Sequence, residues 1–265
     1  MSDPGVRGVF LDFVWKVDRV RKRKPIRKLI LDMDSSVSST HGEQEGSSYN
    51  GTSAAPAITR CFASIQFGDL ERALLRTGKV HSADDCRTIL EPVVARYRHK
   101  NLRRFFRGDA AFAKPKVHRY LEAEGYSYAI RLPANAILHR DIDYLLSWPV
   151  GRPPKKSIVF YHSVLYQAAS WEKPRRVVVR IEWRQGQLFA EVSFIVTNLR
   201  WWEDNVVRFY NQRGTAEQWI KEGKYALTGR ACRAMASRTT RFACSCLPWR
   251  TIWPTSFGGW HCRER

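Results

Sequence analysis

The stretch KLILDMDSS, residues 28–36, has the pattern of a β-strand that delivers acidic side chains to its C-terminal end. Its apolar residues stop at acidic and small polar ones, a boundary typical of strands. Asp32 and Asp34 lie two positions apart, so they face the same side of the strand. The stretch therefore predicts a strand with carboxylates at its end.

The segment LRRFFRGDAAF, residues 102–112, repeats this pattern: a short strand is followed by a glycine, Asp109 and small residues. An apolar spacing of three to four residues predicts a helix over 81–98, and 114–124 also reads as helical. Residues 125–135 read as the next strand. This alternation of strand and helix predicts an α/β core.

The texture of the sequence changes between about 136 and 199, where alternating β segments such as SIVFYHSVLY and RRVVVRIEW dominate. RQGQ reads as a turn between the second of these and LFAEVSFIVTNL. We therefore expect a β-rich insertion over 136–199 between a first part of the core at 27–135 and a closing helix at 200–226. Residues 1–26 form a basic N-terminal segment, and 227–265 form a C-terminal tail.

The composition points to a polyanionic partner. A net charge of +20, from 45 basic and 25 acidic residues, favours nucleic acid, because phosphate neutralisation by Lys and Arg dominates such binding. The sequence has no 18-residue apolar run and no secretory signal pattern, so we expect a cytoplasmic protein that does not enter a membrane. Its six cysteines lack zinc-site spacing and read as free thiols.

The segment YNQRGTAEQWIKEGK, residues 210–224, places an unusual group of side chains on a predicted helix. Tyr210, Arg213, Glu217 and Lys224 fall within a fan of about 60° on one helix face. An acid flanked by two cations and a phenol is suited to carry a metal ion and grip phosphates. An ordinary solvated face is the alternative interpretation of the same pattern.

Three acids stand out by their context: Asp34 and Asp109, each at a strand end before a small residue, and Glu217 on the helix face. Two-metal phosphoryl transfer needs such a trio, because carboxylates must hold two divalent ions about 4 Å apart. Strand ends that meet a helix face supply this geometry. Aspartates also terminate strands without any catalytic role, so spacing leaves both interpretations open.

These motifs resemble the signature of bacterial insertion-sequence transposases of the DDE class. LDMDSS with HGEQEG, then FRGDAAFA, and then Y-x2-R-x3-E-x6-K occur in that family's order, over residues 27 to about 226. The resemblance implies a ribonuclease-H-like fold, a mixed sheet with flanking helices and a β-rich insertion before the last catalytic helix. It further implies that Asp34, Asp109 and Glu217 hold two Mg²⁺ ions, with Mn²⁺ as a possible substitute.

The resemblance also assigns partners and contacts. Tyr210, Arg213 and Lys224 would contact phosphates of the transposon end, and Arg131 is a further candidate DNA contact whose alternative is a solvated strand-end charge. The partner would be double-stranded DNA, both the transposon ends and the target, bound by a homodimer associated with the bacterial nucleoid. Asp32 competes with Asp34 for the first ligand position, but the small polar residues after Asp34 match the family better.

The chain also departs from the family pattern. The family places a DNA-binding and dimerising region before the core and a helical part after the lysine, whereas 1–26 is short and 246–265 lacks helical periodicity. Read in a shifted frame, codons for 249–262 can encode an amphipathic helix, and those for 52–61 a strand-like segment. We therefore predict a decayed copy in which 52–61 has lost a core strand.

Together these features predict a DNA transposase that performs metal-dependent strand cleavage and strand transfer at insertion-sequence ends. Two other functions remain compatible with the sequence. One is a non-catalytic, basic DNA-binding remnant of a transposase, and the other is a general nuclease of ribonuclease-H-like fold. An active enzyme nicks DNA when a metal ion is present, whereas a DNA-binding remnant does not. A general nuclease cleaves DNA regardless of the terminal sequence.

Overall fold

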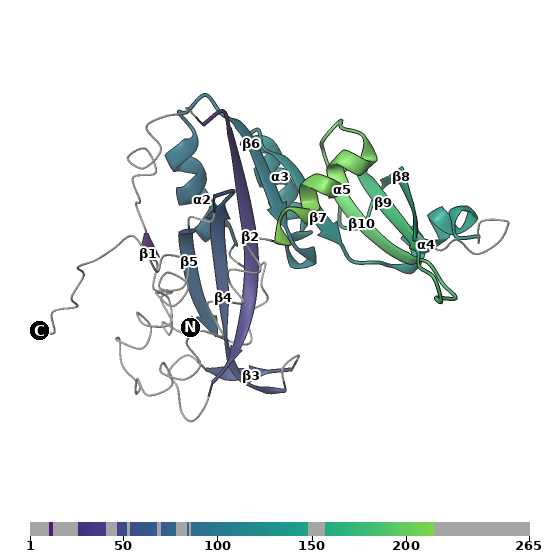
Figure 1. Ribbon diagram of the computed structural model, residues 1–265. Coiled ribbons are helices and arrows are strands. Elements are labelled where there is room, and N and C mark those ends of the chain that lie inside the picture. Colours follow the sequence, from purple (N-terminus) through teal and green to yellow (C-terminus); the bar gives the residue numbers. More distant parts are fainter. Residues whose placement is uncertain are drawn as a thin grey trace, which may run out of the picture. The chain divides into compact units, whose positions relative to one another are not determined.

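The structure is a computed structural model (Figure 1), which describes residues 11–12, 26–40, 47–51, 54–67, 70–77, 84, 86–147 and 157–214. The chain divides into two compact units. Within the described residues, the first unit contains 34–96 and the second unit contains 26–33 and 97–213. Strand β2, Lys28–Ser39, supplies its first half to the second unit and its second half to the first.

The second unit is built on a mixed sheet. Strand β6 pairs in parallel with the first half of β2, from Lys28 opposite Arg103 to Met33 opposite Gly108, and β7 is parallel to β6. The three strands of the predicted insertion continue the sheet in antiparallel fashion, in the order β7-β10-β9-β8. The strands are β6, Arg103–Gly108; β7, Ser127–Leu132; β8, Ile158–Tyr166; β9, Arg175–Trp183; and β10, Glu191–Thr197.

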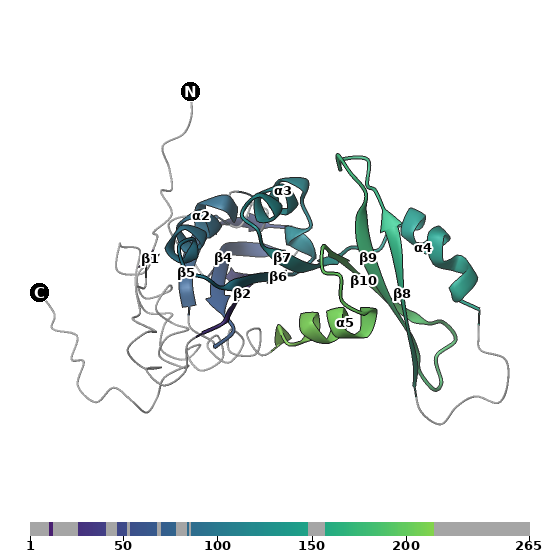
Figure 2. The same cartoon turned by 90° about the horizontal axis from the view of Figure 1, so that it is seen from above.

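Helices cover both faces of this sheet. In Figure 2, α3 (Pro115–Ala123) lies on one face of β6 and β7 and α5 (Glu203–Asn211) lies on the other. The face under α5 holds a buried apolar cluster that includes Ile30, Phe105 and Ala129 from three neighbouring strands and Val206 from the helix. Burial of these side chains supplies the main stabilising contribution and fixes α5 against this face of the sheet.

The insertion begins with a helix that the sequence pattern did not reveal. Strand-like alternation was expected from residue 136, but α4 (Ala136–Ile142) and a 3₁₀ turn (Asp143–Leu145) come first. Asn135 caps α4, because its Oδ1 accepts a hydrogen bond from the Leu138 N–H at 2.8 Å. Among the described residues of this segment, the first strand is β8, which begins at Ile158.

Among its described residues, the first unit contains the second half of β2, a set of antiparallel strands and the helix α2. Its strand order is β1-β5-β4-β2, with the short strand β3 paired to β4. Helix α2, within the predicted helix 81–98, is tied to β5 by an ion pair between Arg96 and Glu71. The elements are β1, Leu11–Asp12; β3, Ser48–Asn50; β4, Ala55–Ile65; β5, Leu70–Thr77; and α2, Cys86–Tyr97.

Strand β4 corrects one prediction. Residues 52–61 were expected to lack a core strand, yet Ala55–Ile65 forms an eleven-residue strand whose inward residues include the fully buried Ala57, Cys61 and Ala63. The strand is paired along both edges, with β2 and β5, and Ile58 and Phe62 on its other face are buried as well, so its sequence does not alternate. No restored reading frame is needed to supply this strand. The tail 246–265 lies outside the described residues.

The predicted fold class is confirmed. Ten strands form a mixed sheet in the order β1-β5-β4-β2-β6-β7-β10-β9-β8, with β3 on β4. At its centre, β4 and β5 form an antiparallel pair on one side of β2, and β6 and β7 run parallel to β2 on the other. This central order is that of a ribonuclease-H-like sheet.

Candidate active site at the end of strand β6

Asp109 stands directly after strand β6 and begins a 3₁₀ turn, Ala110–Phe112. Its Oδ1 accepts a hydrogen bond from the Ala111 N–H at 2.9 Å, and no hydrogen bond to Oδ2 is formed within the described residues. The preceding Gly108 is closely packed, because a Cβ there would lie 3.0 Å from the Phe106 ring. The half-buried carboxylate of Asp109 is thus fixed by the turn while one oxygen is left for a ligand.

Tyr210 and Arg213 come from the end of α5 and the turn after it. The Arg213 N–H donates to the Tyr210 carbonyl oxygen at 3.0 Å, and Arg213 Nη1 lies 3.4 Å from the Tyr210 hydroxyl. Arg213 is only 5% exposed, and Tyr210 packs against the apolar cluster under α5. These two residues therefore do not form the solvated face that was the alternative interpretation of the pattern.

Charged residues of β7 and of the turn after β6 act on the Tyr210 hydroxyl. Burial raises the pKa of Tyr210, the positive charges of Arg213 and Arg131 oppose that rise, and the negative charge of Asp109 adds to it. Because Gly108 pairs with Ile130 in the parallel ladder, Asp109, directly after β6, and Arg131, the next-to-last residue of β7, lie level at the carboxyl ends of neighbouring strands. The second unit therefore brings together four of the predicted site residues.

Three predicted residues do not belong to the described part of the second unit. Asp34 is a half-buried residue of β2 in the first unit, where its Oδ1 accepts the Ser35 N–H at 2.9 Å. Glu217 and Lys224 lie outside the described residues. The triad Asp34, Asp109 and Glu217 accordingly remains a prediction.

Arg107 is a residue that the sequence analysis missed. Its Nε and Nη2 each donate to one carboxylate oxygen of Asp32 at 2.6 Å, and its Nη1 donates to the Phe209 carbonyl oxygen at 2.9 Å. The guanidinium also lies over the Phe209 ring, 5.2 Å from its centroid. Both ion-pair partners are 3% exposed. The sequence does show a charged residue at an unusual place, because Arg107 follows the apolar pair Phe105 and Phe106 and precedes Gly108 at the end of β6.

The ion pair bears on the choice between Asp32 and Asp34. Both oxygens of Asp32 accept charge-assisted hydrogen bonds from a buried arginine, so metal ligation by Asp32 requires breaking that pair. Asp34 is half-buried and closer to the strand end. This contrast favours Asp34 as the first ligand.

The described carboxylates have the right chemistry for a divalent cation, although a complete site is not among them. No group of three His, Cys, Asp or Glu side chains comes together within the described residues, which exclude Glu217. Carboxylate oxygens are the ligands that Mg²⁺ and Mn²⁺ prefer, and Asp109 retains one such oxygen. The residues present therefore fit a magnesium or manganese ion.

Within the part of the chain that the structure describes, no helix has both the length and the apolar character required to span a membrane.

Comparisons with known proteins support a specific family. The family model described as transposase DDE domain group 1 matches residues 14–249. No curated protein matches the sequence. Eight chains of solved structures match, and one is the piggyBac transposase in a synaptic complex with hairpin DNA, with a TM-score of 0.49 and 12% identity over 85% of this chain. The matched part is 47% of that chain, so the present chain spans about half its length.

Proposed function

The chain belongs to the transposase DDE domain group 1 family, and from this premise we propose that it cleaves and transfers DNA strands at the ends of an insertion sequence. In the cleavage step, a water oxygen bonds to phosphorus and the bond to the 3′ oxygen breaks, which leaves a free 3′-hydroxyl. In the transfer step, that hydroxyl attacks a target phosphodiester in line with the leaving oxygen. No covalent enzyme intermediate is needed.

Asp34, Asp109 and Glu217 would hold the divalent ions, in keeping with the general use of such ions by DDE transposases. Bound there, two Mg²⁺ or Mn²⁺ ions would activate the attacking oxygen and stabilise the leaving one. Asp109 contributes a carboxylate whose orientation is fixed by the Ala111 N–H. The free Oδ2 of Asp109 is the feature of the described structure that suits this role.

The residues around Asp109 would hold the DNA strand. The raised pKa of Tyr210 keeps its hydroxyl protonated at neutral pH, so it can donate a hydrogen bond to a phosphate oxygen. The buried Arg213 orients that hydroxyl and adds positive charge behind it. Arg131 is exposed, and we propose that it contacts a phosphate directly, as does Lys224.

The single observation that carries this proposal is the grouping of Asp109 with Arg131, Tyr210 and Arg213 at one edge of the sheet. A carboxylate suited to a cation stands there beside two arginines and a phenol suited to phosphate. A merely structural strand end has no need of this combination. We also expect the active form to be a homodimer that binds double-stranded transposon ends and target DNA.

The test is a nicking assay on duplex DNA copied from the sequences that flank the gene, with and without Mg²⁺. The full chain should nick this DNA only with the metal, and Asp109→Asn should reduce the rate by at least 100-fold while the Kd for DNA changes little. Asp141→Asn is the matched control, because Asp141 is an exposed residue of α4 and its replacement changes the net charge equally.

The alternatives give different results in the same assay. Binding without metal-dependent nicking identifies a non-catalytic DNA-binding remnant. Nicking that is equally fast on unrelated duplexes identifies a general nuclease. Nicking that survives Asp109→Asn contradicts the proposed triad.

A further inference from the structure

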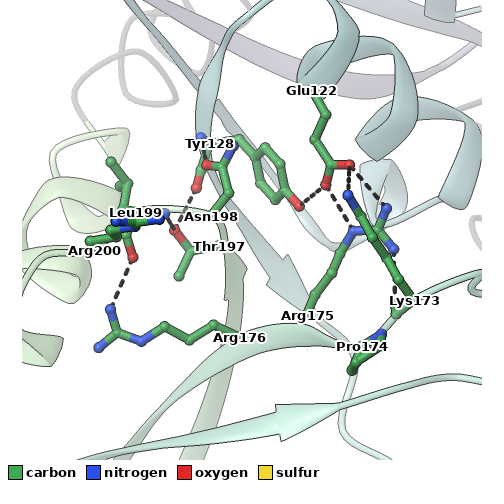
Figure 3. Close-up of a pocket in the computed structure, with 10 residues that line it drawn as sticks. All are labelled: Glu122, Tyr128, Lys173, Pro174, Arg175, Arg176, Thr197, Asn198, Leu199 and Arg200. Atoms are coloured by element: carbon green, nitrogen blue, oxygen red, sulfur yellow. Dashed lines mark hydrogen bonds and ion pairs between the residues drawn. The ribbon is translucent and has the colours of Figure 1, made fainter.

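A second basic feature of the second unit lies away from Asp109. Figure 3 shows a pocket of about 480 Å³ between α3, the start of β9 and the loop after β10. Four cations and one carboxylate line it: Lys173, Arg175, Arg176, Arg200 and Glu122. The lining carries a formal excess of three positive charges, and Glu203, which lies outside the lining, pairs with Arg176 at 2.7 Å.

Two of these cations build the wall of the pocket. The Arg175 Nε donates to Glu122 Oε1 at 3.0 Å, and the guanidinium lies 5.4 Å from the centroid of the Trp171 ring. Arg176 donates to the carbonyl oxygens of Leu199 and Trp201 at 2.9 and 2.7 Å. These contacts fix the backbone on both sides of Arg200 and hold positive charge beneath it.

The Glu122 carboxylate does not prevent the pocket from binding an anion. Burial by itself would raise the pKa of Glu122, but hydrogen bonds from Lys173, Arg175 and Tyr128 lower it to about 2. Glu122 is thus a permanent anion whose oxygens already accept these donors. Its role is to orient Arg175 and Tyr128.

Two cations remain accessible to a ligand. Arg200 is exposed and makes no hydrogen bond or ion pair with any described residue, and the Lys173 side chain is 61% exposed despite its contact with Glu122. An arginine on a fixed loop, beside buried positive charge in a concave surface, is well suited to bind a phosphate.

We infer that this pocket binds a backbone phosphodiester of the DNA, held by Arg200 and Lys173. The inference rests on the proposed function and adds a second contact to the same substrate. Tyr128 lines the pocket three residues before Arg131 on β7, roughly 10 Å along the strand, and the two side chains point to opposite faces of the sheet. Since successive phosphates repeat about every 3.4 Å of helix axis along each DNA strand, the contacted phosphate is a different one from the phosphate that is cleaved.

The first measurement is the salt dependence of DNA binding by the full chain. Arg200→Ala and Lys173→Ala should each reduce the slope of log K against log salt by about one, the value for one lost phosphate contact. Arg98→Ala is the matched control, because it removes the same charge from an exposed side chain that is paired with Glu124. Its slope should stay at the wild-type value.

The second measurement locates the phosphate. Single phosphates of the duplex are replaced in turn by neutral methylphosphonates, and binding is compared for wild type and Arg200→Ala. At one position the replacement should weaken wild-type binding five- to tenfold and leave the binding of Arg200→Ala unchanged. Inorganic phosphate is added as a competitor, to distinguish a free-phosphate site from a DNA contact.

The outcomes separate this inference from the proposed function. If Arg200→Ala and Lys173→Ala behave like Arg98→Ala while Asp109→Asn still abolishes nicking, the pocket inference is wrong and the transposase proposal stands. If inorganic phosphate below 1 mM binds to wild type and not to Arg200→Ala, while the two bind DNA with equal salt slopes, the pocket is a free-phosphate site and the DNA contact is wrong. A chain that binds no DNA contradicts both.

Discussion

Arg107 and Asp32 form a two-pronged ion pair inside the second unit, and the same guanidinium reaches the carbonyl oxygen of Phe209. The pair joins strands β2 and β6 to helix α5. Each contacted segment carries a predicted functional residue one or two positions further on: Asp34, Asp109 and Tyr210. One buried side chain thus sets the relative position of the segments of the second unit that lead to Asp109 and Tyr210.

Removing one member of this pair should be costly. Arg107→Ala leaves the Asp32 carboxylate buried without its cation, so we expect the free energy of unfolding to fall by about 3–5 kcal/mol. Urea denaturation measures the loss. The double variant Arg107→Met/Asp32→Leu, which replaces the pair by apolar side chains, should recover most of the stability but not the nicking rate. Recovery of both would show that the pair has no positioning role.

Glu217 is the next test of the triad. Glu217→Gln removes a ligand charge with little change of volume, so strand cleavage should be abolished while DNA binding is largely retained. Glu222→Gln is the control on the same sequence segment. Cleavage at the wild-type rate by the Glu217 variant would exclude it from the triad.

Arg213 should support the phosphate contact proposed for Tyr210, because it orients the hydroxyl and adds positive charge behind it. Arg213→Ala is expected to weaken DNA binding and to make the log K against log salt plot shallower by about one. Arg208→Ala provides the comparison on α5, because the Arg208 side chain is 71% exposed and pairs with Asp204 within the helix. Equal slopes for the two variants would assign Arg213 a structural role only, that of packing beside Tyr210.

The fold should lose stability in mild acid because of His118. This side chain is fully buried, stacks on Tyr128, and lies edge-on to Trp171. Burial, and then the charge of Arg175, lower the pKa of His118 to about 4. The unfolded chain binds a proton near pH 6.5, so stability should be full above that pH and fall by about 3 kcal/mol as the pH drops toward 4.

The measurement is the urea midpoint between pH 4 and pH 7.5 for wild type and His118→Phe. The phenylalanine keeps an aromatic ring between its neighbours and removes the titration. The stability that Glu122 contributes falls as the pH drops from its ordinary pKa of 4.5 toward about 2, so only the start of that loss lies at the acid end of this window, and it is common to both proteins. Identical pH profiles for the two proteins would contradict the assignment.

The strands and helices that could be predicted are those whose apolar pattern lies within a short stretch of sequence. The strand at 28–36, the strand before Asp109, the helix at 114–124 and the following strand all carry apolar runs with clear ends, and all are present. Strand β4 was missed because it is covered on both faces, which removes the alternation that marks a half-buried strand. Helix α4 was missed because it is short and depends on the Asn135 cap.

The site was predictable to a smaller extent. The order of motifs identified the DDE class, and the end of β6 does bring Asp109 near Arg131, Tyr210 and Arg213. The role of Arg107 could not be read from the sequence, because its partner Asp32 is 75 positions away and only the parallel pairing of β2 with β6 brings the two together. Charge alone also did not distinguish the buried Arg213 from a solvated arginine.

The hydrogen bond from the Ala111 N–H to Asp109 has an entropic consequence. A side chain that is immobilised only on binding a ligand costs about 0.5–1.5 kcal/mol of affinity. Asp109 is already held in one orientation by folding, and the preceding Gly108 packs closely against the Phe106 ring. A ligand that meets Asp109 therefore finds a preorganised oxygen, and the saving corresponds to about a two- to tenfold gain in affinity over a freely rotating carboxylate.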